Sequence, residues 1–133
     1  MHASQIIAAH PDVCGNVNEA LLRCLEACHS CAQACTACAD ACLAEPMVAE
    51  LRQCIRLNLD CADLCAAAGN LASRRTGSNQ SGLTAVLKDC AVTCRDCAEE
   101  CARHAAMHEH CRICADACRR CEQACSVAVA SIR

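Results

Sequence analysis

The spacing of six cysteines between residues 24 and 42 constrains this chain more than any other feature of its sequence. Alternating steps of four and three residues separate them: Cys24, Cys28, Cys31, Cys35, Cys38 and Cys42. This period matches one face of an α-helix and does not match the two-residue period of a β-strand. The stretch therefore predicts a helix with one face that consists of thiols.

The same spacing recurs in three later segments, so four helices with one sulfur face each are predicted. Their expected ranges are 16–43, 47–72, 82–105 and 108–130, with Asn16 or Asn18 as the cap of the first helix. The cysteines on the later faces are Cys54, Cys61, Cys65, Cys90, Cys94, Cys97, Cys101, Cys111, Cys114, Cys118, Cys121 and Cys125. Asn58 stands where the repeat would place another cysteine, and Cys14 lies on a backward extension of the first face.

The lengths of the connections predict how these helices pack. Residues 44–46 and 105–108 form short links, which favour antiparallel neighbours. The predicted fold is therefore all-α: an antiparallel up-down-up-down four-helix bundle with a cysteine-lined core. We expect a single domain over residues 1–133, in which residues 1–15 form an N-terminal arm or short helix and residues 16–130 form the bundle.

The two ends of the predicted bundle differ in composition. Both short links lie at one end, which we call the histidine end and which collects Cys42, Met47, His104, His108, His110 and Cys111. The opposite end, which we call the leucine end, collects Leu21, Leu71, Leu83, Leu87 and Val129. The histidine end is therefore predicted to open into the core, and the leucine end to close it.

Composition limits the compartment and the classes of partner. The 133 residues include 19 cysteines but no Phe, Trp or Tyr, and a net charge of −3 gives no basic surface for nucleic acid. No apolar stretch approaches the roughly 18 residues that would span a bilayer, so no membrane partner is expected. Met1 to His10 lacks the pattern of a secretory signal. A cytoplasmic location is therefore expected, where thiols stay reduced and dense cysteine indicates metal rather than disulfides.

Ligand softness and charge favour Cu(I) as the metal, in multiple ions. Thiolates select Cu(I) among the common cellular metals, and one Cu(I) per bridging thiolate leaves a neutral core. Zn(II) bound by four cysteines leaves two negative charges at each site. Cysteines four residues apart are expected to bring their sulfurs to ~4.5 Å, which suits two-coordinate Cu(I) if its bonds match the ~2.3 Å of Zn–S. The expected capacity is on the order of one ion per cysteine.

Other interpretations stay open at this point. A zinc or cadmium buffer would use the same thiolates, and the pairs Cys94/Cys97 and Cys111/Cys114 come near a zinc-ribbon spacing. A helical interaction module is the second alternative, because a buried free cysteine also behaves as a small hydrophobe. An iron–sulfur carrier fits less well, since those clusters use compact sets of four cysteines. No nucleophile, base and orienting group can be assigned, so an enzyme is not expected.

Non-sulfur ligands are expected at the histidine end. His104 and His108 continue the sulfur face and are expected to bind metal, whereas His110 and Met47 are weaker candidates. Asn58 either offers its side-chain oxygen to a metal or fills a polar pocket. Three further histidines lie off the sulfur faces and are predicted to be solvated: His2, His10 and His29.

Three motifs give this chain a resemblance to a known family. They are the Cys24–Cys42 series, the run Cys54-Ile55-Arg56-Leu57-Asn58-Leu59-Asp60-Cys61, and the run His108-Glu109-His110-Cys111-Arg112-Ile113-Cys114. From about Asn16 to Ser126 the chain resembles the cytosolic copper storage proteins, which are cysteine-rich bacterial four-helix bundles. This resemblance implies storage of many Cu(I) ions per subunit, access at the histidine end, Asn58 and His104 as non-sulfur ligands, and a homotetramer. Cys14 lies outside the shared pattern. A copper chaperone or small thiols are the expected copper donors.

Overall fold

The computed structural model describes residues 2–132, and within this range the regular structure is entirely helical. The elements are α1 (Ala3–Ala8), α2 (Glu19–Leu43), the 3₁₀ turn η1 (Val48–Leu51), α3 (Arg52–Ser73), α4 (Gln80–His104) and α5 (Glu109–Ser131). None of these described helices has the length and apolarity that a bilayer crossing requires.

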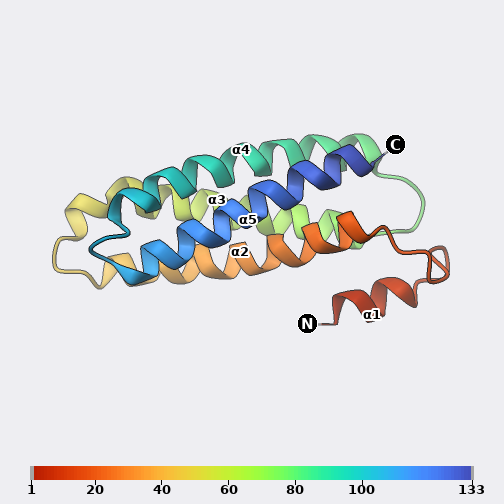
Figure 1. The fold of residues 1–133 in the computed structure, drawn as a ribbon, viewed down its shortest axis with the longest axis horizontal. Coiled ribbons are helices and arrows are strands. Elements are labelled where there is room, and N and C mark those ends of the chain that lie inside the picture. Colours follow the sequence, from red (N-terminus) through yellow and green to blue (C-terminus); the bar gives the residue numbers. More distant parts are fainter. Residues whose placement is uncertain (1, 133) are drawn as a thin grey trace.

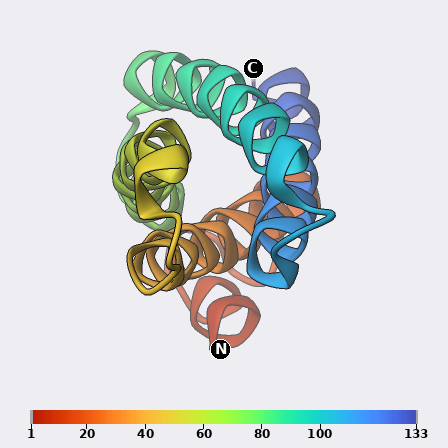
Figure 2. The ribbon, with the colours of Figure 1, turned by 90° about the vertical axis from the view of Figure 1, so that its left-hand side faces the viewer.

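The four long helices run antiparallel to their neighbours along one axis (Figure 1). Viewed along that axis, they form a square in which α2 and α4 each pack against both α3 and α5 (Figure 2). The short helix α1 lies outside the square and packs against α2. The predicted up-down-up-down four-helix bundle is therefore confirmed.

The side chain of Asn18 forms the hydrogen bonds that mark the start of α2. Asn18, and not Asn16, caps α2, because its Oδ1 accepts a hydrogen bond from the Leu21 N–H at 3.1 Å. The amide of Asn18 also donates to Ser131 Oγ at 3.1 Å, which ties the start of α2 to the end of α5. The expected helix ranges 47–72 and 82–105 leave a connection that is longer than the observed one, since α3 extends to Ser73 and α4 already begins at Gln80.

Leucines close the bundle at the leucine end. Leu21, Leu83 and Leu87 are at most 3% exposed, while Leu71 and Val129 are partly buried and pack against the same core. Helix α1 extends this apolar layer, because two of its side chains, Ala3 and Ile7, join the core cluster. The prediction of an apolar closure at this end agrees with the structure.

Replacing Leu87 by Ala is expected to lower the free energy of unfolding of the metal-free protein by about 2–5 kcal/mol, because it leaves a cavity in the leucine closure. Leu59 is the matched control, since it is 47% exposed on α3 and its replacement by Ala should cost far less. Urea unfolding under reducing conditions measures the free energy of unfolding of both variants. Equal losses in the two variants would contradict the assignment of Leu87 to the closure.

One of the three histidines predicted to be solvated has a packing role. His29 is partly buried, and its ring lies 2.7–3.0 Å from the point that a Cβ on Gly69 would occupy. Gly69 therefore allows α3 to approach the His29 ring of α2, and the prediction of a solvated His29 is wrong. His2 is exposed, and His10 is half-buried with its Nε2 3.0 Å from Thr76 Oγ1.

Candidate metal centre

Eighteen of the 19 cysteines are buried, and all 19 are free thiols. The sulfur faces of α2, α3, α4 and α5 all turn toward the bundle axis, where they replace the aliphatic side chains of an ordinary core. We call these eighteen buried thiols the sulfur column. The structure thus brings every cysteine of the predicted sulfur faces into one interior.

Cysteines four residues apart on one helix have sulfurs close enough to share an ion. The Sγ–Sγ distance is 4.0 Å for Cys24/Cys28 and 3.8 Å for both Cys31/Cys35 and Cys61/Cys65. These distances are shorter than the predicted 4.5 Å. At a metal–sulfur distance of ~2.3 Å, trigonal coordination needs sulfurs about 4.0 Å apart. The observed sulfur spacing is thus closer to three-coordinate Cu(I) than to the expected two-coordinate form.

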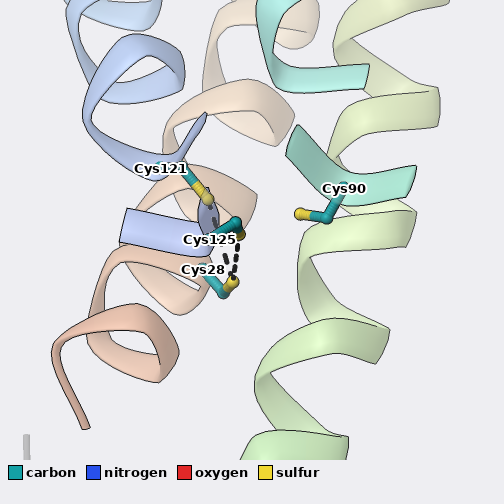
Figure 3. A group of neighbouring side chains, drawn as sticks. All are labelled: Cys28, Cys90, Cys121 and Cys125. Carbon is teal, nitrogen blue, oxygen red and sulfur yellow. Dashed lines mark hydrogen bonds between the residues drawn. The ribbon is translucent and has the colours of Figure 1, made fainter. Parts of the chain in front are cut away.

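Sulfurs from different helices complete sets of four ligands. Cys28 of α2 lies 3.8 Å from both Cys121 and Cys125 of α5. Cys90 of α4 points at these three from across the bundle (Figure 3). Three further sets lie along the axis, with ligand atoms all within 4.8 Å of one another: Cys31/Cys65/Cys94/Cys121, Cys31/Cys35/Cys61/Cys118 and Cys35/Cys97/Cys114/Cys118.

The four sets are not independent sites, because they share thiols. Cys31, Cys35, Cys118 and Cys121 each belong to two sets, so the four sets contain only twelve different cysteines. Four Zn(II) ions on twelve thiolates would leave four uncompensated negative charges in a buried core, which is costly. One Cu(I) per thiolate would leave none. The sharing of thiols therefore favours a continuous Cu(I)–thiolate chain over closed zinc sites.

Asn58 is fully buried within the sulfur column. Three thiols donate hydrogen bonds to its Oδ1, those of Cys97 at 3.1 Å, Cys114 at 3.2 Å and Cys101 at 3.3 Å. Its amide donates to Cys54 Sγ at 3.7 Å. The side-chain oxygen is therefore surrounded by thiols and accepts hydrogen bonds from S–H groups whose protons a metal ion would displace.

The histidine end contains a mixed ligand set. His110 Nδ1 lies 3.4 Å from Cys38 Sγ and 3.6 Å from Cys111 Sγ, and Cys42 completes the set. His110, expected to be a weaker candidate than His104 and His108, is the histidine that lies among the sulfurs. His110 lies one residue off the helical register, yet it reaches the sulfurs because it sits in the first turn of α5.

The two histidines expected to bind metal both contact carboxylates. His104 Nε2 lies 2.9 Å from Glu100 Oε2, one turn earlier on α4. His108 Nδ1 lies 3.0 Å from Glu45 Oε2, in the link between α2 and α3. Glu45 could not be singled out from the sequence, because the helical register says nothing about which link faces which ring. Glu100 could have been, since it precedes His104 by four residues on one helix.

Cys14 lies apart from the sulfur column. It is exposed in the turn between α1 and α2, with a φ of 51°, and its Sγ donates to the Pro11 carbonyl. The backward extension of the first sulfur face fails because α2 begins only at Glu19, so Cys14 does not share its helical register. The structure therefore does not bring Cys14 to the other predicted ligands.

Burial and mutual hydrogen bonding shift the pKa values of the column thiols. Burial raises the pKa of Cys42 from 9.0 to about 11 and raises that of Cys111 above its usual range. The hydrogen bond with Cys121, helped by burial, raises the pKa of Cys28. The hydrogen bond that Cys90 forms with Cys121 lowers the pKa of Cys90. Most of these thiols are thus neutral without metal, so copper binding must release protons and weaken as the pH falls.

The raised pKa of Cys42 also predicts a loss of stability of the metal-free protein at alkaline pH. Its neutral thiol is favoured in the folded state, while in the unfolded chain it ionises near 9.0. The contribution to the free energy of unfolding is therefore complete below pH 9.0 and is lost as the pH rises to about 11. Thermal unfolding of reduced, metal-free protein at several pH values measures it. An unfolding temperature that stays level through this range would contradict the prediction.

Comparisons with known proteins show which proteins this chain is similar to. The sequence model of the copper storage protein family, Csp, matches residues 17–130, which run from the residue before the cap of α2 to the last turn of α5. The cysteine-rich protein YhjQ of Bacillus subtilis, described as uncharacterized, is 38% identical over 102 residues, which are 77% of this chain and 89% of that protein.

Two solved structures of the Streptomyces lividans copper storage protein Ccsp resemble this chain. The structure of Ccsp loaded with 10 copper equivalents has a TM-score of 0.93 and 53% sequence identity, and the match covers 98% of this chain and 99% of that one. The structure with five coppers has a TM-score of 0.84 and 58% identity, covering 86% and 96% of the two chains. The predicted family is confirmed: this chain belongs to the copper storage protein family.

Proposed function

We propose that this protein stores many Cu(I) ions per chain as a thiolate-bound chain of ions along the bundle axis. One observation carries the proposal: eighteen buried free thiols lie in contact with one another. Adjacent hydrogen-bonded sulfurs are 3.5–4.0 Å apart, so one thiolate can bridge successive ions. The copper equivalents described for the Streptomyces lividans relative support the same function.

The proposed ligands are the eighteen column thiols together with Asn58 and the histidines of the histidine end. Copper would enter at that end, because His110 and Cys38 lie close together there while leucines close the other end. His104 and His108 would join the ligands once Cu(I) competes with Glu100 and Glu45. Cys14 has no proposed role in storage, since it is exposed and outside the column.

The cellular location, the assembly and the copper donors are also proposals. A cytosolic location would keep the thiols reduced, and one Streptomyces lividans relative is described as cytosolic. A storage role without catalysis suits a core in which eighteen thiols face one another. A homotetramer of bundles is the assembly that the family resemblance suggests, and light scattering on the purified protein would test it. Copper chaperones or small thiols are the proposed donors.

Anaerobic titration of the reduced protein with Cu(I) tests the proposed function. We expect uptake on the order of one ion per buried thiol, with little change in helical circular dichroism, because the ligands are already assembled. Saturation at one or two ions would contradict storage. A zinc buffer is the second candidate, since the four-thiol sets also have dimensions that suit tetrahedral Zn(II). Competition between Cu(I) and Zn(II) on one sample distinguishes copper storage from a zinc buffer, and we expect Cu(I) to displace Zn(II).

A further inference from the structure

A single carboxylate connects two histidines at the histidine end. Glu45 lies in the link between α2 and α3, next to the start of α5. Its Oε2 is 3.0 Å from His108 Nδ1, and its Oε1 is 3.5 Å from His110 Nε2. The two rings stack with centroids 5.5 Å apart. The Glu45 side chain is 28% exposed, while that of His108 is only 6% exposed, so the group is partly sheltered from bulk water.

The two nitrogens of the His110 ring have different surroundings. Nδ1 faces the sulfurs of Cys38 and Cys111 at 3.4 and 3.6 Å. Nε2 is buried and lacks a well-formed hydrogen bond within the described part of the chain. The carboxylate of Glu45 is the partner in reach of this nitrogen. A neutral imidazole carries its proton on one nitrogen and a lone pair on the other, and an ionised carboxylate only accepts hydrogen bonds. Glu45 thus favours the proton on Nε2 and leaves the lone pair of Nδ1 toward the sulfurs.

We propose that Glu45 is a positioning residue for copper uptake, which holds His110 in the Nε2–H tautomer so that Nδ1 can bind Cu(I) beside Cys38 and Cys111. This inference rests on the proposed storage function and adds the group that prepares the ligand. A carboxylate paired with a metal-binding histidine commonly fixes the tautomer and orientation of that ring.

The second carboxylate at this end is less suited to the same role. Glu100 pairs with one ring, that of His104, and also lies 3.6 Å from Arg103 Nη1. Glu45 contacts two rings, and within residues 2–132 its ion pairs involve histidines alone. His108 then acts as the second anchor of the Glu45 carboxylate, which limits the rotation of that side chain.

The variant Glu45→Gln tests the proposal. Glutamine keeps the size of the side chain but offers one acceptor oxygen, so it cannot face both rings as an acceptor. In metal-free protein at about pH 8.5, where an unperturbed imidazole is neutral, two-bond ¹⁵N–¹H correlation spectra report the His110 tautomer. The rate of the first Cu(I) transfer from a coloured Cu(I) chelator reports uptake. Glu50→Gln is the matched control, because Glu50 is exposed in η1 at the same end.

We expect Glu45→Gln to lose the Nε2–H preference of His110 and to slow the first transfer about tenfold. Glu50→Gln should retain the wild-type tautomer and rate. If Glu45→Gln keeps the wild-type tautomer, or loses it without slower transfer, the proposal is overturned. Should this variant lose its helical signal, Glu45→Asp replaces it, since the shorter side chain cannot reach both rings. The tautomer is read without copper, so failure of storage itself would appear separately, as low capacity of the wild-type protein.

Discussion

The largest loss of copper capacity is expected when four central thiols are replaced by alanine together: Cys31, Cys35, Cys97 and Cys118. These residues lie in the overlapping four-thiol sets at the middle of the sulfur column. With one Cu(I) per thiolate, the variant should bind about four fewer ions than the wild-type protein. Alanine is chosen because it keeps the core apolar and has the highest helix propensity.

Replacement of Cys14 by alanine is the matched control for this experiment. Cys14 is exposed and lies outside the column, so its loss should leave the capacity unchanged. Anaerobic titration followed by metal analysis of the desalted protein counts the ions, and circular dichroism checks the helices. If the quadruple variant binds as many ions as the wild type, the central thiols are core filler and the storage proposal fails.

Copper loading is expected to raise the unfolding temperature more than any single substitution changes it. The ligands come from all four long helices, so an ion between them binds the folded chain, where its ligands are already assembled, more tightly than the unfolded one. An ion present at a thousand times its dissociation constant contributes about 4 kcal/mol. For a chain of this length, one such ion corresponds to roughly 15 °C, and further ions add to it.

Differential scanning calorimetry of metal-free and Cu(I)-loaded protein under anaerobic conditions measures this shift. The quadruple alanine variant should show a smaller shift, because fewer ions link its helices. Coincident unfolding temperatures for the two wild-type forms would contradict the proposal that the ions lie between helices. The comparison also separates core binding from copper held at exposed groups, which would leave the unfolding temperature nearly unchanged.

The bundle could be predicted because one pattern determines both the helices and their packing. A three-four spacing of cysteines defines a helical face, and four such faces joined by two short links fit an antiparallel bundle. The leucine closure followed from the same register. The docking of α1 was not predictable, since its apolar residues are few, and neither was the close approach of His29 to Gly69.

The sulfur ligands could be predicted more fully than the histidine end. Inward cysteines follow from the helical register, which is a property of the sequence. His110 was ranked below His108 because register alone places His108 on the sulfur face. At the first turn of a helix, however, a side chain can reach past the register, and Glu45 already engages His108. The prediction that Cys14 extends the first sulfur face was wrong because α2 begins only after this residue.

The most direct test of the account is an anomalous-difference map at the copper absorption edge, from crystals of protein loaded anaerobically with Cu(I). We predict a row of copper peaks along the bundle axis, from His110 at the histidine end toward Leu87 at the leucine end, with thiolate sulfurs as the main ligands. Copper peaks confined to exposed groups, with an empty sulfur column, would contradict it.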